Sequence, residues 1–172
     1  MFHINLWRWK MKKGFTIVEL LIVILIIGIF TGLSIPIFRS ISSETLSSRA
    51  ESFASVLKSA RETAIVRNLE CRIIFNPNSR EYILQYGNEQ PKHYSVDFRF
   101  SPGYATLAAP ECGGGAPDPD GVQFPDNTLI IDSKGYATPG AVYVSQGRES
   151  YAIGIAVSGR IKVWKWGGGR WY

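Results

Sequence analysis

An apolar run near the N-terminus constrains this chain more than any other feature. It covers residues 15–38, FTIVELLIVILIIGIFTGLSIPIF, and contains a single charge, that of Glu19. A helix of that length would measure roughly 36 Å at about 1.5 Å per residue, against a bilayer core of about 30 Å. Four basic residues precede it: Arg8, Lys10, Lys12 and Lys13. Because positive charge favours the cytoplasm, we expect one membrane pass with the N-terminus inside and residues 39–172 outside.

Three ordinary explanations of the run compete. A secretory signal peptide has an apolar region of only about 7–15 residues and a small-residue cleavage site, which the segment TGLSIPIF does not offer. The length and the N-terminal position disfavour a buried core helix. A plain membrane anchor fits the length but leaves Glu19 unexplained, since a carboxylate in lipid costs roughly 2.5–3.5 kcal/mol and usually has a partner.

Residues 12–21, KKGFTIVELL, resemble the class III signal of type IV prepilins and pseudopilins. The resemblance implies that a prepilin peptidase cuts between Gly14 and Phe15 on the cytoplasmic side, and that Phe15 is then N-methylated. It also implies that the apolar run is kept as a helix in the core of a filament. Residues 1–14 are then a leader peptide, which starts at either Met1 or Met11.

The same resemblance gives Glu19 a role in assembly. In that family this glutamate meets the positively charged amine of the first mature residue, here Phe15, on a neighbouring subunit. Pairing offsets the desolvation of both charges, so the acid favours docking in one register. Gly28 and Pro36 also match positions of the family, and both residue types weaken a helix.

The pattern changes after residue 37 to that of an amphipathic helix. Apolar residues recur at spacings of three and four along one face: Leu46, Ala50, Phe53, Leu57, Ala60 and Ala64. Charged residues fall mostly off that face, which favours a solvated position for them: Arg49, Glu51, Lys58, Arg61, Glu62 and Arg67. The helix is predicted to end near Asn68.

Strands are predicted to follow the helix. Residues 71–75 and 81–86 flank the turn sequence NPNSR and indicate a hairpin. A second hairpin joins residues 151–157 to 160–166 through Ser158 and Gly159. Weaker strand signals lie between the hairpins, at residues 94–100, 129–131 and 141–145.

The segment from Ser101 to Pro125 is rich in proline and glycine and is predicted to be a long loop. The order of helix, strands and closing hairpin resembles the GspH/FimT-like branch of minor pseudopilins and minor pilins. It implies an α+β fold, in which a long N-terminal helix, half transmembrane and half amphipathic, packs on an antiparallel sheet. Residues 39–172 are then a periplasmic pilin-like domain.

Catalysis and cofactor binding are disfavoured by the residues present. The histidines are His3, in the leader, and His93, which has no recognisable nucleophile motif around it. No phosphate-binding or zinc-protease motif occurs. Asp118, Asp120 and Asp126 could ligate calcium, but their spacing misses the EF-hand pattern and such clusters are usually turns, so no metal site is predicted.

The two cysteines, Cys71 and Cys112, would both lie outside the cytoplasm, where disulfides persist. The alternatives are a Cys71–Cys112 disulfide, which we favour, and two unpaired buried thiols. A bond would close a loop of about 40 residues and stabilise the fold by roughly 4 kcal/mol on chain-entropy grounds.

The C-terminus alternates basic and aromatic residues. The basic ones are Arg160, Lys162, Lys165 and Arg170, and the aromatic ones are Trp164, Trp166, Trp171 and Tyr172. Cations can neutralise phosphates and rings can stack on bases, so this region is a candidate DNA-binding site. Some FimT-like proteins take up DNA through a Gly-Arg-x-Arg pattern, where this chain has lysine at the last position, Lys162. A solvated strand face with an aromatic contact patch is the alternative.

The sequence as a whole predicts a structural subunit rather than an enzyme: a minor pseudopilin or minor pilin of the inner membrane, assembled into a type II secretion pseudopilus or a type IV pilus. Its expected partners are a prepilin peptidase, other minor subunits, the major subunit and membrane lipid. A DNA-binding minor pilin is the alternative. The net charge of +5 is largely that of the leader, since residues 15–172 carry 15 basic and 14 acidic side chains.

Overall fold

The computed structural model describes residues 17–26 and 45–172, which belong to two separate units of the chain. Residues 17–26 are helical, and the remainder of the predicted 15–38 span lies outside the described residues. In the part of the chain that the structure describes, no helix is both long and apolar enough to cross a membrane.

The predicted amphipathic helix is confirmed as α2, Leu46–Arg67. Thr45 caps its start, since the Thr45 side chain accepts a hydrogen bond from the backbone N–H of Ser48. Asn68 ends it in the left-handed conformation, and its backbone N–H bonds back to Ala64 and Ile65. The apolar stripe read from the sequence is the buried face of the helix.

The strands form two antiparallel groups. A four-stranded sheet has the order β3-β2-β1-β6, made of Lys92–Ser95, Glu81–Tyr86, Cys71–Asn76 and Thr128–Ile131. A larger sheet has the order β10-β9-β8-β7-β4, made of Arg170–Trp171, Ile161–Gly167, Glu149–Ile155, Gly140–Gln146 and Arg99–Phe100. Strand β5, Val122–Gln123, also pairs with β7. These findings confirm the α+β class.

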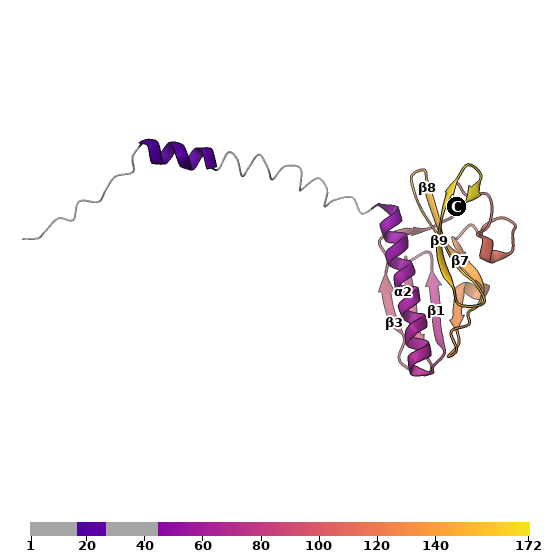
Figure 1. The fold of residues 1–172 in the computed structure, drawn as a ribbon. Helices are drawn as coiled ribbons and strands as arrows, with labels where there is room; N and C mark the ends of the chain where they lie inside the picture. The colour runs from indigo at the N-terminus through magenta and orange to yellow at the C-terminus, as the bar shows by residue number, and fades with distance from the viewer. Residues whose placement is uncertain (1–16, 27–44) are drawn as a thin grey trace, which may run out of the picture. The chain divides into compact units, whose positions relative to one another are not determined.

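The main hydrophobic core, here called the helix-side core, lies between α2 and the two sheets. In Figure 1, α2 runs along the strands, with β3 and β1 on either side of it in this view and β7–β9 beyond β1. The helix-side core includes the buried side chains of Leu46, Phe53, Leu57, Cys71, Ile73, Phe75, Phe98, Phe100, Leu129, Ile131, Val142, Val144, Ile153 and Ile155. Residues 45–172 therefore carry a core of their own.

A second, smaller group of side chains, here called the outer cluster, lies on the opposite face of the larger sheet. It consists of Ala109, Ala141, Tyr143 and Ala152, with Cys112, Trp164 and Trp171 packed against it. Successive residues of a strand point to opposite faces, so Tyr143 faces the outer cluster while its neighbours Val142 and Val144 face the helix-side core.

Two stretches differ from the sequence prediction. The expected strand over residues 94–100 is split, because β3 ends at Ser95 in one sheet and β4 begins at Arg99 in the other. The turn between them places Phe98 in the helix-side core. The expected loop over residues 101–125 contains β5 and a short 3-10 helix, η1, Pro110–Cys112.

Candidate functional site

The described part of the N-terminal helix is an exposed apolar surface. Every residue from Ile17 to Ile26 is exposed. Ile17, for example, has 80% and Leu25 has 64% of its maximal accessible surface open to solvent. A helix that is apolar on all sides is stable only when lipid or other protein surrounds it. Glu19 lies on this helix, whereas Gly14 and Phe15 lie outside the described residues.

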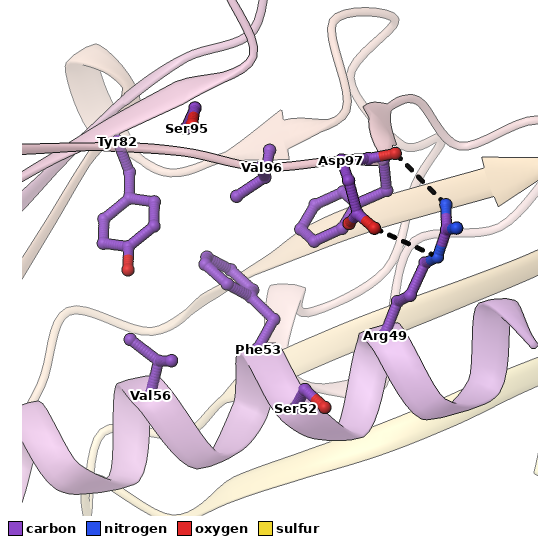
Figure 2. A pocket seen from close by; sticks show the side chains of 9 residues that line it. Arg49, Ser52, Phe53, Val56, Tyr82, Ser95, Val96 and Asp97 are labelled. Carbon is purple, nitrogen blue, oxygen red and sulfur yellow. Dashed lines mark hydrogen bonds and ion pairs between the residues drawn. The ribbon is translucent and has the colours of Figure 1, made fainter. Parts of the chain in front are cut away.

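A groove runs along α2 on the side of β2 and β3. It consists of two hollows of about 290 and 270 Å³ that share the side chains of Val56 and Tyr82. Figure 2 shows the first hollow, with the Phe53 ring at its centre and Arg49 at one end. Arg49 donates from Nη1 to the Asp97 carbonyl at 3.1 Å, and its Nε lies 3.4 Å from the Asp97 carboxylate.

Arg61 fastens two turns to the C-terminal end of α2. Its guanidinium donates to the carbonyl of Gly135 at 2.9 Å and to that of Ser158 at 3.3 Å. Gly159 allows this approach, because it adopts φ +73° and a Cβ there would collide with the Gly135 carbonyl. Arg67 likewise pairs with Glu89 at 3.2 Å. The expectation that these charges are simply solvated is therefore wrong for the half-buried Arg49 and Arg61, whereas Arg67 is exposed as expected.

The basic residues proposed for DNA binding do not share one face. Lys162 lies on the outer face of β9, with its Nζ 3.5 Å from the Trp164 ring centroid. Lys165 faces the opposite way, 3.6 Å from Glu149 and 5.7 Å from the Tyr151 ring centroid. Arg160, in the hairpin turn, and Arg170, on β10, are both exposed. Because side chains alternate between the two faces of a strand, Lys162 and Lys165 lie on opposite faces of β9.

The aromatic residues of the C-terminus hold the loop around η1 against the sheet. The Trp164 indole donates to the Glu111 carboxylate at 2.9 and 3.2 Å, and the Trp171 indole donates to the Leu107 carbonyl at 2.8 Å. The Glu111 carboxylate lies over Gly154, where a Cβ would collide with it. Sequence reasoning missed Glu111, because no local pattern pairs it with a tryptophan 53 residues later.

We expect Glu111→Ala to loosen this loop and lower the free energy of unfolding of residues 45–172 by about 1.5–3 kcal/mol, since a charged acceptor is lost. Urea unfolding followed by tryptophan fluorescence measures the change. Glu111→Gln keeps an acceptor for the indole and should lose less than half as much. Equal losses for both variants would show that the hydrogen bond to Trp164 is not what holds the loop.

The two cysteines are free thiols, which corrects the predicted disulfide. Cys71 lies in the helix-side core, whereas Cys112 packs against the outer cluster, so the larger sheet separates them. Burial raises the pKa of Cys71 to about 12 and also raises the pKa of Cys112. The Cys112 sulfur lies 3.7 Å from the Tyr143 hydroxyl, which accepts from Ala109 N–H at 2.9 Å and donates to Gln123 at 2.6 Å.

The raised Cys71 pKa predicts a loss of stability at alkaline pH. Below pH 9, the ordinary thiol value, both folded and unfolded states hold the proton and there is no effect. Above it the unfolded state loses the proton first, so the free energy of unfolding should fall by about 1–2 kcal/mol between pH 9 and 10.5. Urea unfolding across this range tests it, and Cys71→Ala should reduce the slope to the part that the raised pKa of Cys112 contributes. An unchanged slope in that variant would contradict the assignment.

The acidic loop serves the local fold. Asp120 accepts hydrogen bonds from the Val122 N–H at 3.0 Å and from the Asn127 side-chain amide at 2.9 Å. Asp126 adopts φ 51° inside a second 3-10 turn, η2, Pro125–Asn127. Within residues 17–26 and 45–172, no three acidic, histidine or cysteine side chains lie close enough together to hold a metal ion.

Comparisons with known proteins give two adjacent family matches. Residues 9–35 match the model of the prokaryotic N-terminal methylation motif, and residues 49–159 match the model described as Type II transport protein GspH. Two fimbrial proteins of Pseudomonas aeruginosa are each 40% identical over 73 residues, which cover 42% of this chain and 47% of each relative. The chain thus spans about half the length of these curated relatives. No solved structure matches significantly.

Proposed function

The chain belongs to the Type II transport protein GspH family, and we propose from this premise that it is a minor subunit of a pilus or pseudopilus. The observation that carries the proposal is the order of the two matches, with the methylation motif directly ahead of the GspH domain. This family and the fimbrial relatives are structural pilin-type proteins rather than enzymes.

Before assembly, the chain is proposed to lie in the inner membrane, with the N-terminus in the cytoplasm and residues 39–172 in the periplasm. A prepilin peptidase removes residues 1–14 between Gly14 and Phe15, and Phe15 is methylated. The apolar helix then leaves lipid for the filament core, where Glu19 pairs with the amine of a neighbouring Phe15. The exposed apolar surface of residues 17–26 supports this step, because such a helix needs a nonaqueous environment at each stage.

Two experiments on the native host decide the minor role and the host machine. Filaments are sheared from cells and the chain is quantified against the major subunit by mass spectrometry; we expect a ratio well below one to ten. Deleting the gene should either leave exported enzymes in the periplasm, for a type II secretion pseudopilus, or remove surface pili, for a type IV pilus. A near-equal ratio, or no effect on either process, would contradict the proposal.

DNA uptake through the C-terminal hairpin is the alternative function, and the divided orientation of Lys162 and Lys165 weighs against it. We expect residues 45–172 to bind duplex DNA weakly in a gel shift, with less than a threefold change when Arg160, Lys162 and Lys165 are all replaced by alanine. Arg170→Ala tests the remaining cation in the same way. A loss of binding above tenfold in either variant would restore the alternative, since phosphate contacts depend on these charges.

A further inference from the structure

Strand β3, Lys92–Ser95, forms an unprotected edge of the four-stranded sheet. Among the described residues, the strand order β3-β2-β1-β6 leaves one side of β3 without a partner, and all four residues of β3 are exposed. An unpaired edge presents a row of backbone N–H and C=O groups that can accept another strand. Lys92 stands at the end of the strand, so the middle of the edge carries no charged lysine or carboxylate.

The hydrogen-bonding pattern identifies which groups face outward. The N–H of Val96 bonds to the carbonyl of Arg80, one step beyond the paired residues Ser95 and Glu81. In an antiparallel pair, bonded and non-bonded positions alternate, so Tyr94 and Lys92 also bond inward to β2. The backbone groups of His93 and Ser95 therefore point away from the sheet and toward the free edge.

The side chain of Tyr94 lies on the same face of the sheet as α2. It stacks on Tyr82 with ring centroids 5.1 Å apart and lines the groove beside Val56 and Ser59. Tyr94 is still 40% exposed, so one side of its ring is open. The edge thus offers hydrogen-bonding groups and an aromatic surface at the same point.

We propose that β3 pairs with β3 of a second copy of this chain, antiparallel and about a two-fold axis at Tyr94. In this register His93 of each copy faces Ser95 of the other, and each such pair exchanges both of its backbone hydrogen bonds. The two Tyr94 rings meet on one face and extend the stack that begins at Tyr82. The two four-stranded sheets become one continuous sheet.

Charge and symmetry favour a second copy of this chain as the partner of the free β3 edge. The register places Lys92 of one copy opposite Val96 and next to Asp97 of the other, and the two-fold axis repeats this contact at the other end. The Asp97 side chain is 63% exposed and so can meet a second cation besides Arg49. No two like charges face each other, and a strand that is complementary to itself in this way forms a closed pair rather than a fibre.

The contact is small. Four residues a side bury far less than the roughly 1,200 Å² of a stable interface, so we expect a weak dimer with a dissociation constant on the order of 0.1 mM. The inference concerns the folded domain alone and does not depend on the proposed function. Sedimentation equilibrium of residues 45–172 between 0.01 and about 1 mM measures the dimer directly.

Cysteine cross-linking tests the register. Residues opposite each other at a non-bonded position have Cα atoms about 4.5 Å apart, within the range of about 4.4–6.8 Å for a disulfide. Tyr94→Cys should therefore form a disulfide-linked dimer on mild oxidation, in a Cys112→Ser background. Ser95→Cys is the matched control and should not, because two copies of residue 95 are offset by two positions, roughly 7 Å along the strands.

A proline variant tests the backbone bonds. Ser95→Pro removes one outward N–H without removing a bond to β2, and should raise the dissociation constant at least tenfold; Ser95→Ala keeps the N–H and should leave it unchanged. If Ser95→Pro does not fold, the two cysteine variants still decide. A monomer throughout the concentration range with no Tyr94→Cys cross-link would overturn the proposal. So would a Tyr94→Cys cross-link in membranes whose partner, by mass, is a different protein.

Discussion

Replacing Glu19 by valine is expected to remove the chain almost completely from sheared filaments while leaving it in the membrane fraction. In the proposed assembly, the carboxylate of Glu19 and the amine of Phe15 from a neighbour are buried together in an apolar core. Removing one partner leaves the other charge buried alone, at a cost of about 3–5 kcal/mol. That cost corresponds to a loss of about 10²–10⁴-fold in incorporation, measured by quantitative immunoblots of both fractions.

The matched control for this experiment is Val18→Ala, which changes the neighbouring residue without touching the charge. It should be incorporated within about twofold of the unchanged chain, because an apolar side chain gains little on moving from lipid to an apolar filament core. Both variants should still be cleaved, since Gly14 and Phe15 are intact. Normal incorporation of the Glu19→Val chain would show that the carboxylate does not set the register of assembly.

Phe53→Ala should lower the free energy of unfolding of residues 45–172 by about 3–5 kcal/mol, which is a large share of the stability of a domain this size. Phe53 is 4% exposed, and its ring packs at centroid distances of 5.4 Å from both Tyr82 and Phe98 and 6.3 Å from Phe75. It joins α2 to the four-stranded sheet and to the turn between β3 and β4, so a cavity there cannot close by moving one element. Urea unfolding followed by circular dichroism measures the loss.

Two other substitutions isolate the packing effect at Phe53. Phe53→Leu fills most of the volume and should cost less than about 1.5–2 kcal/mol. Val66→Ala, on the same helix at 84% exposure, should cost less than about 0.5 kcal/mol. A loss at Phe53→Ala no larger than at Val66→Ala would contradict the placement of the Phe53 ring in the core.

Local periodicity explains why much of the domain could be predicted from the sequence. The spacing from Leu46 to Ala64 allows only one buried face on a helix, and that face is the one α2 buries. The turn residues of NPNSR fix the hairpin of β1 and β2, and the closing hairpin follows in the same way from Ser158 and Gly159.

Contacts between residues far apart in the sequence could not be predicted from local periodicity. Whether Cys71 and Cys112 meet depends on which face of the larger sheet each one approaches, and no local pattern reports this. The break between β3 and β4 depends on Phe98 entering the core from a turn that Arg49 and Asp97 hold. The alternation of side chains along a strand already predicts that Lys162 and Lys165 lie on opposite faces of β9. The closely spaced basic residues in the sequence nevertheless suggested a single basic surface.

The proposed N-terminal signal is a different case, because a peptidase would recognise the identities of the residues around Gly14 rather than their packing. The described structure begins after them, at Ile17. The resemblance of KKGFTIVELL to prepilin signals agrees with the methylation motif matched over residues 9–35. Cleavage itself stays a prediction.

Mass spectrometry of the chain's N-terminal peptide, purified from membranes of cells that contain a prepilin peptidase, tests the central proposal most directly. We expect a mature chain that begins at Phe15 and carries one additional methyl group on its amine. Cells without the peptidase should retain the leader, beginning at Met1 or Met11. An unprocessed N-terminus in peptidase-containing cells, or cleavage at any bond other than Gly14–Phe15, would contradict it.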